Sequence, residues 1–220
     1  GIQNPGGDYN QLATTLLQIE NEFYGTIRPK RVIRPGERPL HALRERGVEY
    51  VEVRLMDLDP FEPIGLNADT ARFLDLFLLH CLLEDSPPDS PDEIAAVKNN
   101  QHLTAARGRE PGLLLQRLGQ PVTLADWAAD IVGQLEPVAA AMDAQDGGRA
   151  YADALAAARA ALAAPHTLPS ARVLSAMRAE HADSFSAFVS ARSLDTRAQL
   201  LALPYSADLK ARFDQLAAAS

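Results

Sequence analysis

The pattern of apolar residues changes near residue 65, and this change most constrains the fold of the chain. Before it, short runs rich in β-branched residues alternate with turns that contain glycine and proline. After it, apolar residues recur at helical spacing, first at Phe73, Leu74, Phe77, Leu78, Cys81 and Leu82. We therefore expect an α+β protein, with a strand-rich part over residues 1–64 and a mostly helical part over residues 65–220.

Capping residues set the expected limits of the helices. Asn67 is a good N-cap, and Ser90 is followed by a proline and then by Glu93 at the capping-box position. Thr123 is predicted to cap a long helix that ends before two glycines. The predicted helices cover residues 67–84, an element starting at 90, and residues 123–146, 150–164, 170–192 and 206–218.

The first part is predicted to contain two strands, residues 11–24 and 48–59. A basic segment, residues 27–36, lies between them. Its Pro29 and Pro35 exclude a helix and argue against a central strand, so an irregular segment is expected there. A short helix over residues 39–47 is expected to lead into the second strand.

The second predicted strand carries charge on a single face. Side chains alternate along a strand, so Tyr50, Glu52 and Arg54 share one face. A carboxylate can bind Mg²⁺ together with substrate phosphate oxygens, and an adjacent guanidinium can stabilise a transferring phosphoryl group. The alternative is an ordinary cross-strand ion pair on a solvated sheet face. The spacing alone leaves both interpretations open and favours the ion pair.

Composition restricts the function classes. The 220 residues are 47% hydrophobic, which is typical of a folded globular protein, and the net charge of −8 disfavours a broad nucleic-acid-binding surface. Cys81 is the single cysteine, so no disulfide can form within the chain, and a cytoplasmic location is expected. No apolar run reaches the roughly 20 residues that span a bilayer. Because the sequence starts at Gly1 and soon reads as strand, we expect the C-terminal piece of a longer or processed protein, with a trimmed but complete domain as the alternative.

Seven segments, in the same order along the chain, give a more specific indication. They are residues 17–24 (LQIENEFY), 27–31 (IRPKR), 48–54 (VEYVEVR), 59–65 (DPFEPIG), 72–77 (RFLDLF), 108–113 (GREPGL) and 170–174 (SARVL). Together they resemble glutamate–cysteine ligase of the proteobacterial type, also called γ-glutamylcysteine synthetase. The resemblance runs from residue 1 to about residue 180 and corresponds to the C-terminal two-fifths of the family's length.

The resemblance implies a fold and an activity. The family uses a curved antiparallel sheet like that of glutamine synthetase, with metal-binding glutamates on its concave face. It joins the γ-carboxyl group of L-glutamate to the amine of L-cysteine through γ-glutamyl phosphate, with ATP as co-substrate and Mg²⁺ as cofactor. Most of the metal-binding glutamates and a metal-binding histidine lie upstream in the family, so the chain alone is expected to be inactive and to need the missing N-terminal half. No nucleic acid or membrane partner is implied.

The resemblance also implies residue roles. Glu52 corresponds to a metal-ligating glutamate, Arg54 to the arginine that contacts the transferred phosphate, and Tyr24 to a tyrosine of the substrate-binding region. Arg28 and Arg31 lie in the basic segment and are candidates for binding nucleotide phosphates. Two alternatives stay open: a γ-glutamyl ligase with a different amine acceptor, and a non-catalytic helical interaction module. For Arg172, in the last segment, a structural ion pair is expected.

Overall fold

The computed structural model describes residues 3, 5–8, 25–86 and 88–219. It divides the chain into two compact units, Gly1–Leu58 and Asp59–Ser220. The division falls before the turn that starts at Asp59, because that turn bonds to helices of the second unit. The composition of the sequence had placed the change near residue 65. The predicted strand over residues 11–24, which includes Tyr24, lies outside the described residues. The α+β class is confirmed.

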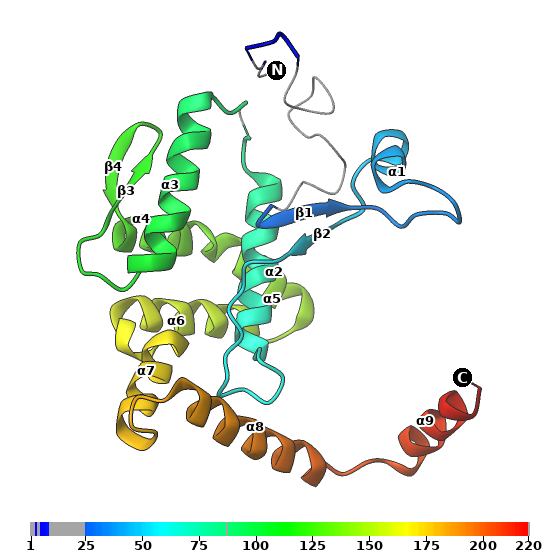
Figure 1. The fold of residues 1–220 in the computed structure, drawn as a ribbon. Coiled ribbons are helices and arrows are strands. Elements are labelled where there is room, and N and C mark those ends of the chain that lie inside the picture. The colour runs from blue at the N-terminus through cyan, green and yellow to red at the C-terminus, as the bar shows by residue number, and fades with distance from the viewer. Residues whose placement is uncertain (1–2, 4, 9–24, 87, 220) are drawn as a thin grey trace. The chain divides into compact units, whose positions relative to one another are not determined.

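The first unit contains β1 (Ile27–Lys30), α1 (Pro39–Arg46) and β2 (Tyr50–Val53). The two strands are antiparallel, with Arg28 opposite Glu52 and Lys30 opposite Tyr50 (Figure 1). The short helix predicted over residues 39–47 is confirmed as α1. It ends at Gly47, whose positive φ of 72° lets its N–H reach the carbonyl of Leu43.

The prediction that residues 27–36 are irregular throughout is wrong at their start, because β1 contains Pro29. The Arg54 N–H bonds to the Thr26 carbonyl, which makes Ile27 and Val53 a non-hydrogen-bonded pair. Alternation along the ladder puts Pro29 and Val51 in the same kind of pair. The missing N–H of proline therefore costs no ladder bond. The second strand is shorter than predicted and covers Tyr50–Val53.

The second unit is mainly helical, with one hairpin. Its elements are α2 (Ala68–Leu83), α3 (Pro91–Arg107), β3 (Leu114–Arg117), β4 (Gln120–Thr123), α4 (Leu124–Gln134), α5 (Glu136–Asp146), α6 (Ala150–Ala163), the 3₁₀ helix η2 (Pro165–Thr167), α7 (Pro169–Glu180), α8 (Phe185–Ala202) and α9 (Ala207–Ala219). The predicted caps are confirmed. Asn67 accepts from the Thr70 N–H, Ser90 from Glu93 and Thr123 from Asp126.

Two predicted helices are each broken in two. The helix predicted over residues 123–146 is interrupted between α4 and α5, because Pro137 has no N–H for the Gly133 carbonyl and its ring crowds that carbonyl. The helix predicted over residues 170–192 is interrupted between α7 and α8. There Ala182 and Asp183 have positive φ of 47° and 60°, and Ser184 caps a new helix.

The core of the second unit lies where α2, α4, α5 and α6 meet (Figure 1). Its buried residues are Leu76, Val132, Leu135, Ala139 and Leu155. The carboxylate of Asp143, on α5, accepts hydrogen bonds from the N–H groups of Tyr151 and Ala152 at the start of α6. This contact satisfies two of the N–H groups that every helix start leaves without a partner, so it ties α5 to α6.

The hairpin of β3 and β4 was not predicted from the sequence. Asn100, on α3, is 7% exposed. Its amide donates to the Gln116 carbonyl at 2.7 Å and accepts from the Gln116 N–H at 2.9 Å. The side chain thus bonds to β3 as a neighbouring strand would. The available signal in the sequence was the glycine of the pair Leu118-Gly119. In the structure this pair forms the two-residue turn, with both residues at positive φ.

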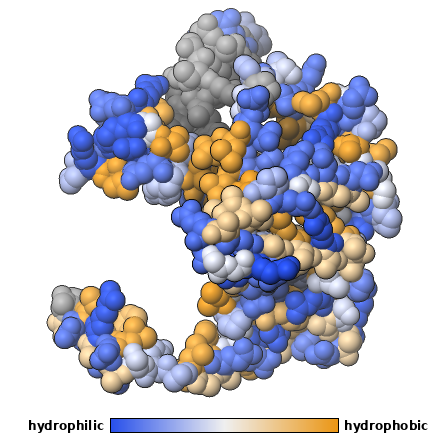
Figure 2. All heavy atoms as spheres, turned by 180° about the vertical axis from the view of Figure 1, so that it is seen from behind, coloured by the Kyte–Doolittle hydropathy of each residue, from blue (hydrophilic) through white to orange (hydrophobic). Residues whose placement is uncertain are grey.

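Helix α9 keeps its apolar residues at the surface. Leu209, Phe213 and Leu216 are 40%, 55% and 57% exposed, and orange apolar patches mark the surface of α9 in Figure 2. Within the described residues, no helix has both the length and the hydropathy needed to cross a membrane.

Candidate functional site

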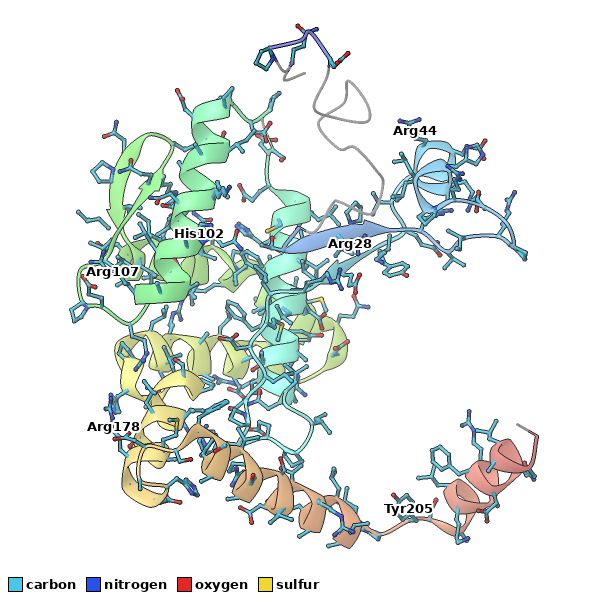
Figure 3. All side chains as sticks on the ribbon, in the orientation of Figure 1. Arg28, Arg44, His102, Arg107, Arg178 and Tyr205 are labelled. Carbon is cyan, nitrogen blue, oxygen red and sulfur yellow. The ribbon has the colours of Figure 1, made fainter. Side chains whose placement is uncertain are left out.

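The β1–β2 sheet has one charged face, built by the register of its two strands. Residues that lie opposite each other in an antiparallel pair project to the same side of the sheet. The pairs of Arg28 with Glu52 and of Lys30 with Tyr50 therefore share a face, which Arg54 extends. We call these five residues the charged face. Figure 3 shows Arg28 on β1, and on α1 it shows Arg44, which is not part of this face.

Glu52 lies at the centre of the charged face. Its Oε2 is 3.0 Å from Lys30 Nζ and its Oε1 is 3.7 Å from Arg54 Nε. Although the side chain as a whole is 39% exposed, Oε2 is shielded from solvent and, among the described residues, has an ion pair with Lys30 but no hydrogen bond of good geometry. Lys30 is therefore the closest cation to this oxygen and pairs with it mainly through charge.

The surrounding cations keep Glu52 ionised. The ammonium group of Lys30 is the largest cause that lowers the pKa of Glu52, and the charges of Arg54 and Arg28 act in the same direction. Partial burial opposes them by raising the pKa, and the net shift is downward. The carboxylate is thus in the form that a metal ion or an arginine would bind.

The predicted sharing of a face by Glu52 and Arg54 is confirmed by their 3.7 Å contact. The contacts present are those of the alternative interpretation, an ion pair across strands, with Lys30 as the closer partner. Lys30 was not paired with Glu52 from the sequence. The alternation of Arg28 and Lys30 around Pro29 was the available signal, but it requires the strand pairing to be known.

Arg31 does not join the charged face. Its Nη1 donates to the Arg46 carbonyl at the end of α1 at 2.9 Å, and its Nε lies 3.4 Å from Glu49. Adjacent residues of an extended chain point to opposite sides, which separates Arg31 from Lys30. The predicted binding of nucleotide by Arg31 stays a prediction, and Tyr24 lies outside the described residues.

The charged face suits a metal ion that arrives with phosphate better than it suits a bare ion. Among the described residues, Glu52 is the one carboxylate on this face, next to three cations. Mg²⁺ is commonly held by one or two carboxylates together with substrate phosphate oxygens. Polyphosphate would neutralise Arg28, Lys30 and Arg54 while Glu52 contributes one ligand to the metal. The residues present therefore fit part of a metal–nucleotide site.

Three residues in and next to α1, Glu37, His41 and Glu45, lie close together but do not form a metal site. Ligand atoms of Glu37, His41 and Glu45 lie within 4.8 Å of one another. However, Arg46 binds both oxygens of Glu37, at 2.6 and 2.8 Å. Glu37 is therefore already neutralised, and we assign no metal to this group.

Comparison with known proteins identifies similar sequences and folds. Residues 1–104 match the family model described as glutamate–cysteine ligase. The chain is 49% identical over 214 residues to the glutamate–cysteine ligase of Azotobacter vinelandii, and 48% identical over 220 residues to that of Pseudomonas paraeruginosa. Each match covers 97% of this chain and 40% of the relative, so the chain spans about two-fifths of the length of these curated relatives.

Two solved structures are similar in fold. A crystal structure of glutamate–cysteine ligase from Francisella tularensis in complex with AMP has a TM-score of 0.78 and 34% identity, covering 96% of this chain and 41% of that one. A bifunctional glutathione synthetase from Pasteurella multocida has a TM-score of 0.62 and 22% identity, covering 86% and 22%. At that identity the second likeness shows the fold alone.

Proposed function

We propose that this chain, which belongs to the glutamate–cysteine ligase family, supplies one wall of a Mg·ATP site in an enzyme that joins L-glutamate to L-cysteine. A γ-carboxylate oxygen of glutamate attacks the terminal phosphorus of ATP, giving γ-glutamyl phosphate and ADP. The cysteine amine then attacks the acyl carbon, phosphate leaves, and the nitrogen loses one proton as the amide forms. This is the first step of glutathione biosynthesis.

The observation that carries the proposal is the position of Glu52 among Arg28, Lys30 and Arg54. Phosphoryl transfer is catalysed mainly by positioning and by stabilisation of charge on the phosphoryl oxygens. Arg54 would contact the transferred phosphoryl group, Arg28 and Lys30 would bind neighbouring phosphates, and Glu52 would ligate Mg²⁺, which neutralises phosphate charge when bound. The AMP in the Francisella tularensis relative supports an adenine nucleotide as the ligand.

The rest of the site is proposed to lie in the part of the longer protein that this chain does not cover. The curated relatives extend well beyond the matched 40% of their length, and one carboxylate is a small share of a Mg²⁺ coordination shell. We therefore expect the isolated chain to lack ligase activity. The cytoplasmic location expected from the sequence stays a prediction.

Reconstitution tests the proposed function. The chain is co-expressed with the unmatched part of the Azotobacter vinelandii relative, and ADP release is measured with glutamate, ATP and Mg²⁺, with and without cysteine. We expect cysteine-dependent ADP release from the pair and none from the chain alone. The test variant is Arg54→Lys, and its matched control is Arg44→Lys. Arg44 is an exposed arginine of the same unit that lies outside the charged face.

The same assay separates the alternatives. Equal rates with cysteine and with other amines would indicate a γ-glutamyl ligase of different acceptor choice. A complex that assembles but releases no ADP would indicate a non-catalytic interaction module. Substantial γ-glutamylcysteine formation by the chain alone would contradict the division of the site between two parts of the protein.

A further inference from the structure

Each carboxylate oxygen of Glu52 faces a different cation. Oε2 lies 3.0 Å from Lys30 Nζ, and Oε1 lies 3.7 Å from Arg54 Nε. A metal ion with Glu52 as a ligand would occupy one of these oxygens, and its charge would repel the cation already beside that oxygen. Metal binding at Glu52 therefore requires one of the two cations to move away.

Lys30 is the cation with the stronger hold on Glu52. Its contact is the shorter of the two, and Lys30 is the largest cause that lowers the pKa of Glu52, ahead of Arg54 and Arg28. Arg28 is the residue directly opposite Glu52 in the ladder, so Lys30 reaches the carboxylate along the diagonal between the strands. Long side chains can span that diagonal. The pair therefore depends on the reach of the lysine stem as well as on the register.

The Lys30 side chain can leave Glu52 while the sheet stays in place. The Lys30 carbonyl accepts from the Glu49 N–H at 2.9 Å, and the Thr26 carbonyl accepts from the Arg54 N–H at 2.9 Å, so backbone bonds hold both ends of the ladder. The ammonium is a point charge on a flexible four-carbon stem. The side chains of Lys30 and Glu52 are 34% and 39% exposed. Ion pairs this exposed shift an equilibrium by only about two- to fivefold, so rotation of the stem is enough to release the carboxylate.

A bare divalent cation and a metal–polyphosphate complex would meet Lys30 differently. The bare ion adds positive charge beside Lys30, Arg28 and Arg54, and it brings no anion to receive a displaced ammonium group. Polyphosphate brings oxygens to which lysine binds well as a point charge. Displacement of Lys30 from Glu52 is therefore costly for the bare ion and compensated for the complex.

We propose that Lys30 occupies the metal-binding oxygen of Glu52 until polyphosphate arrives, and so makes metal binding depend on the nucleotide; this inference rests on the proposed function. In the free protein the Lys30 ammonium holds Oε2. When the metal–nucleotide complex binds, Lys30 releases Glu52 and contacts a phosphate oxygen. Lys30 thereby determines which ligand the charged face accepts, Mg²⁺ carried by ATP in preference to Mg²⁺ alone.

A titration with Mg²⁺ alone tests the competition at Glu52. MgCl₂ is added to the 220-residue chain, and NMR follows the chemical shift of the Glu52 carboxyl carbon, with NaCl of equal ionic strength as the reference. The variants are Lys30→Met, which removes the charge at similar length, and Lys30→Arg, which keeps it. Arg44→Met is the matched control, because it removes one exposed positive charge of the same unit outside the charged face. An amide spectrum of each variant checks that the sheet is retained.

A second titration tests the transfer of Lys30 to phosphate. The reconstituted protein, made by co-expression as above, is titrated with Mg·ATP in a calorimeter without glutamate, so that no phosphoryl acceptor is present. Lys30→Met should tighten binding of Mg²⁺ alone by about three- to tenfold and weaken binding of Mg·ATP by a similar factor of about three- to tenfold. Lys30→Arg should bind Mg²⁺ alone no more tightly than the wild type. Arg44→Met should change either affinity by less than about twofold.

The two titrations together can overturn the inference. If Lys30→Met weakens both ligands, the ion pair only supports the sheet; if it leaves Mg²⁺ affinity unchanged, Lys30 does not compete for Glu52. An equal gain in Mg²⁺ affinity for Arg44→Met would assign the effect to net charge. Tighter Mg²⁺ binding with unchanged Mg·ATP binding would contradict the transfer to phosphate. If the wild-type reconstituted protein binds no Mg·ATP, the proposed nucleotide site fails, while the titration with Mg²⁺ alone still decides the competition at Glu52.

Discussion

At the scale of single residues, Glu52 and its cations are the main finding. The carboxylate is paired with Lys30 and Arg54, which is what a metal-free sheet face would show. Under the proposed function the same cations would bind polyphosphate, and among the described residues the shielded Oε2 lacks a well-oriented hydrogen bond. The ion pair and the proposed metal–phosphate site would then be two occupancies of one arrangement, and substitutions can separate them.

Glu52→Gln should affect metal-bound and metal-free nucleotide in opposite directions. Loss of an anionic ligand should raise the Mg²⁺ concentration for half-maximal ATP binding by on the order of tenfold. Affinity for ATP in the presence of EDTA should hold or rise, because the carboxylate no longer repels phosphate. Calorimetric titration measures both. Glu49→Gln is the control, since Glu49 contacts Arg31 away from the charged face. Equal effects of the two variants would favour the simple ion pair.

Arg54→Lys should lower the rate of ADP release by the reconstituted enzyme by about ten- to a hundredfold, with little change in KM for ATP. Lysine keeps the charge but loses the planar pair of donors that fits a phosphoryl group. Steady-state kinetics measure the two parameters separately. A rise in KM without loss of kcat would assign Arg54 to ground-state binding instead of phosphoryl transfer.

At the scale of elements, α1 and the turn before it are held by a paired arginine. Arg46 donates two hydrogen bonds to the Glu37 carboxylate and a third to the Val32 carbonyl at 3.0 Å. The hydrogen bonds from Arg46, and next the bond from the Arg34 N–H, lower the pKa of Glu37 from its ordinary 4.5 to about 2. A lowered pKa means that the ionised carboxylate stabilises the folded form.

The Glu37 contribution should therefore have a defined pH window. It should be fully present above about pH 4.5, where the carboxylate is ionised folded or unfolded, and be lost as pH falls towards about 2. A carboxyl NMR titration should give a Glu37 midpoint near 2. Arg46→Gln should move that midpoint back towards 4.5. A midpoint that is the same in both proteins would contradict the pairing.

At the scale of the whole molecule, the second unit has its own buried core, centred on Leu76 and Leu135, both 0% exposed. Leu135 lies between α4 and α5, where Pro137 interrupts the helix, and it shares a buried cluster with Val132 of α4 and Ala139 of α5. Leu135→Ala should lower the free energy of unfolding of this unit by about 2–5 kcal/mol. Urea unfolding followed by circular dichroism measures the change.

Leu216→Ala is the matched control for the core prediction. Leu216 lies on α9 and is 57% exposed, so its truncation should change the unfolding free energy by less than about 0.5 kcal/mol. Equal losses for the two leucines would mean that α9 contributes to the core as much as the α4–α5 junction does.

Features that depend on a few neighbouring residues could be predicted from the sequence. The caps Asn67, Ser90 and Thr123 each bond an N–H three residues away, so the sequence alone located three helix starts. The common face of Glu52 and Arg54 follows from the period of a strand. The segments that resemble the family likewise indicated Glu52 and Arg54 as candidate site residues.

Other features depend on which segments meet in space, and only the tertiary structure decided them. Lys30 became the nearest partner of Glu52 through the β1–β2 register, and Arg31 was directed instead to the end of α1. Ala182 and Asp183, both at positive φ, separate α7 from the start of α8, which Ser184 caps. In the second unit, Arg172 contacts Asp59 and Arg192 contacts Pro60, in each case more than 100 positions away along the chain. Local backbone preferences set the elements, whereas long-range contacts, which no short window contains, set the charged face.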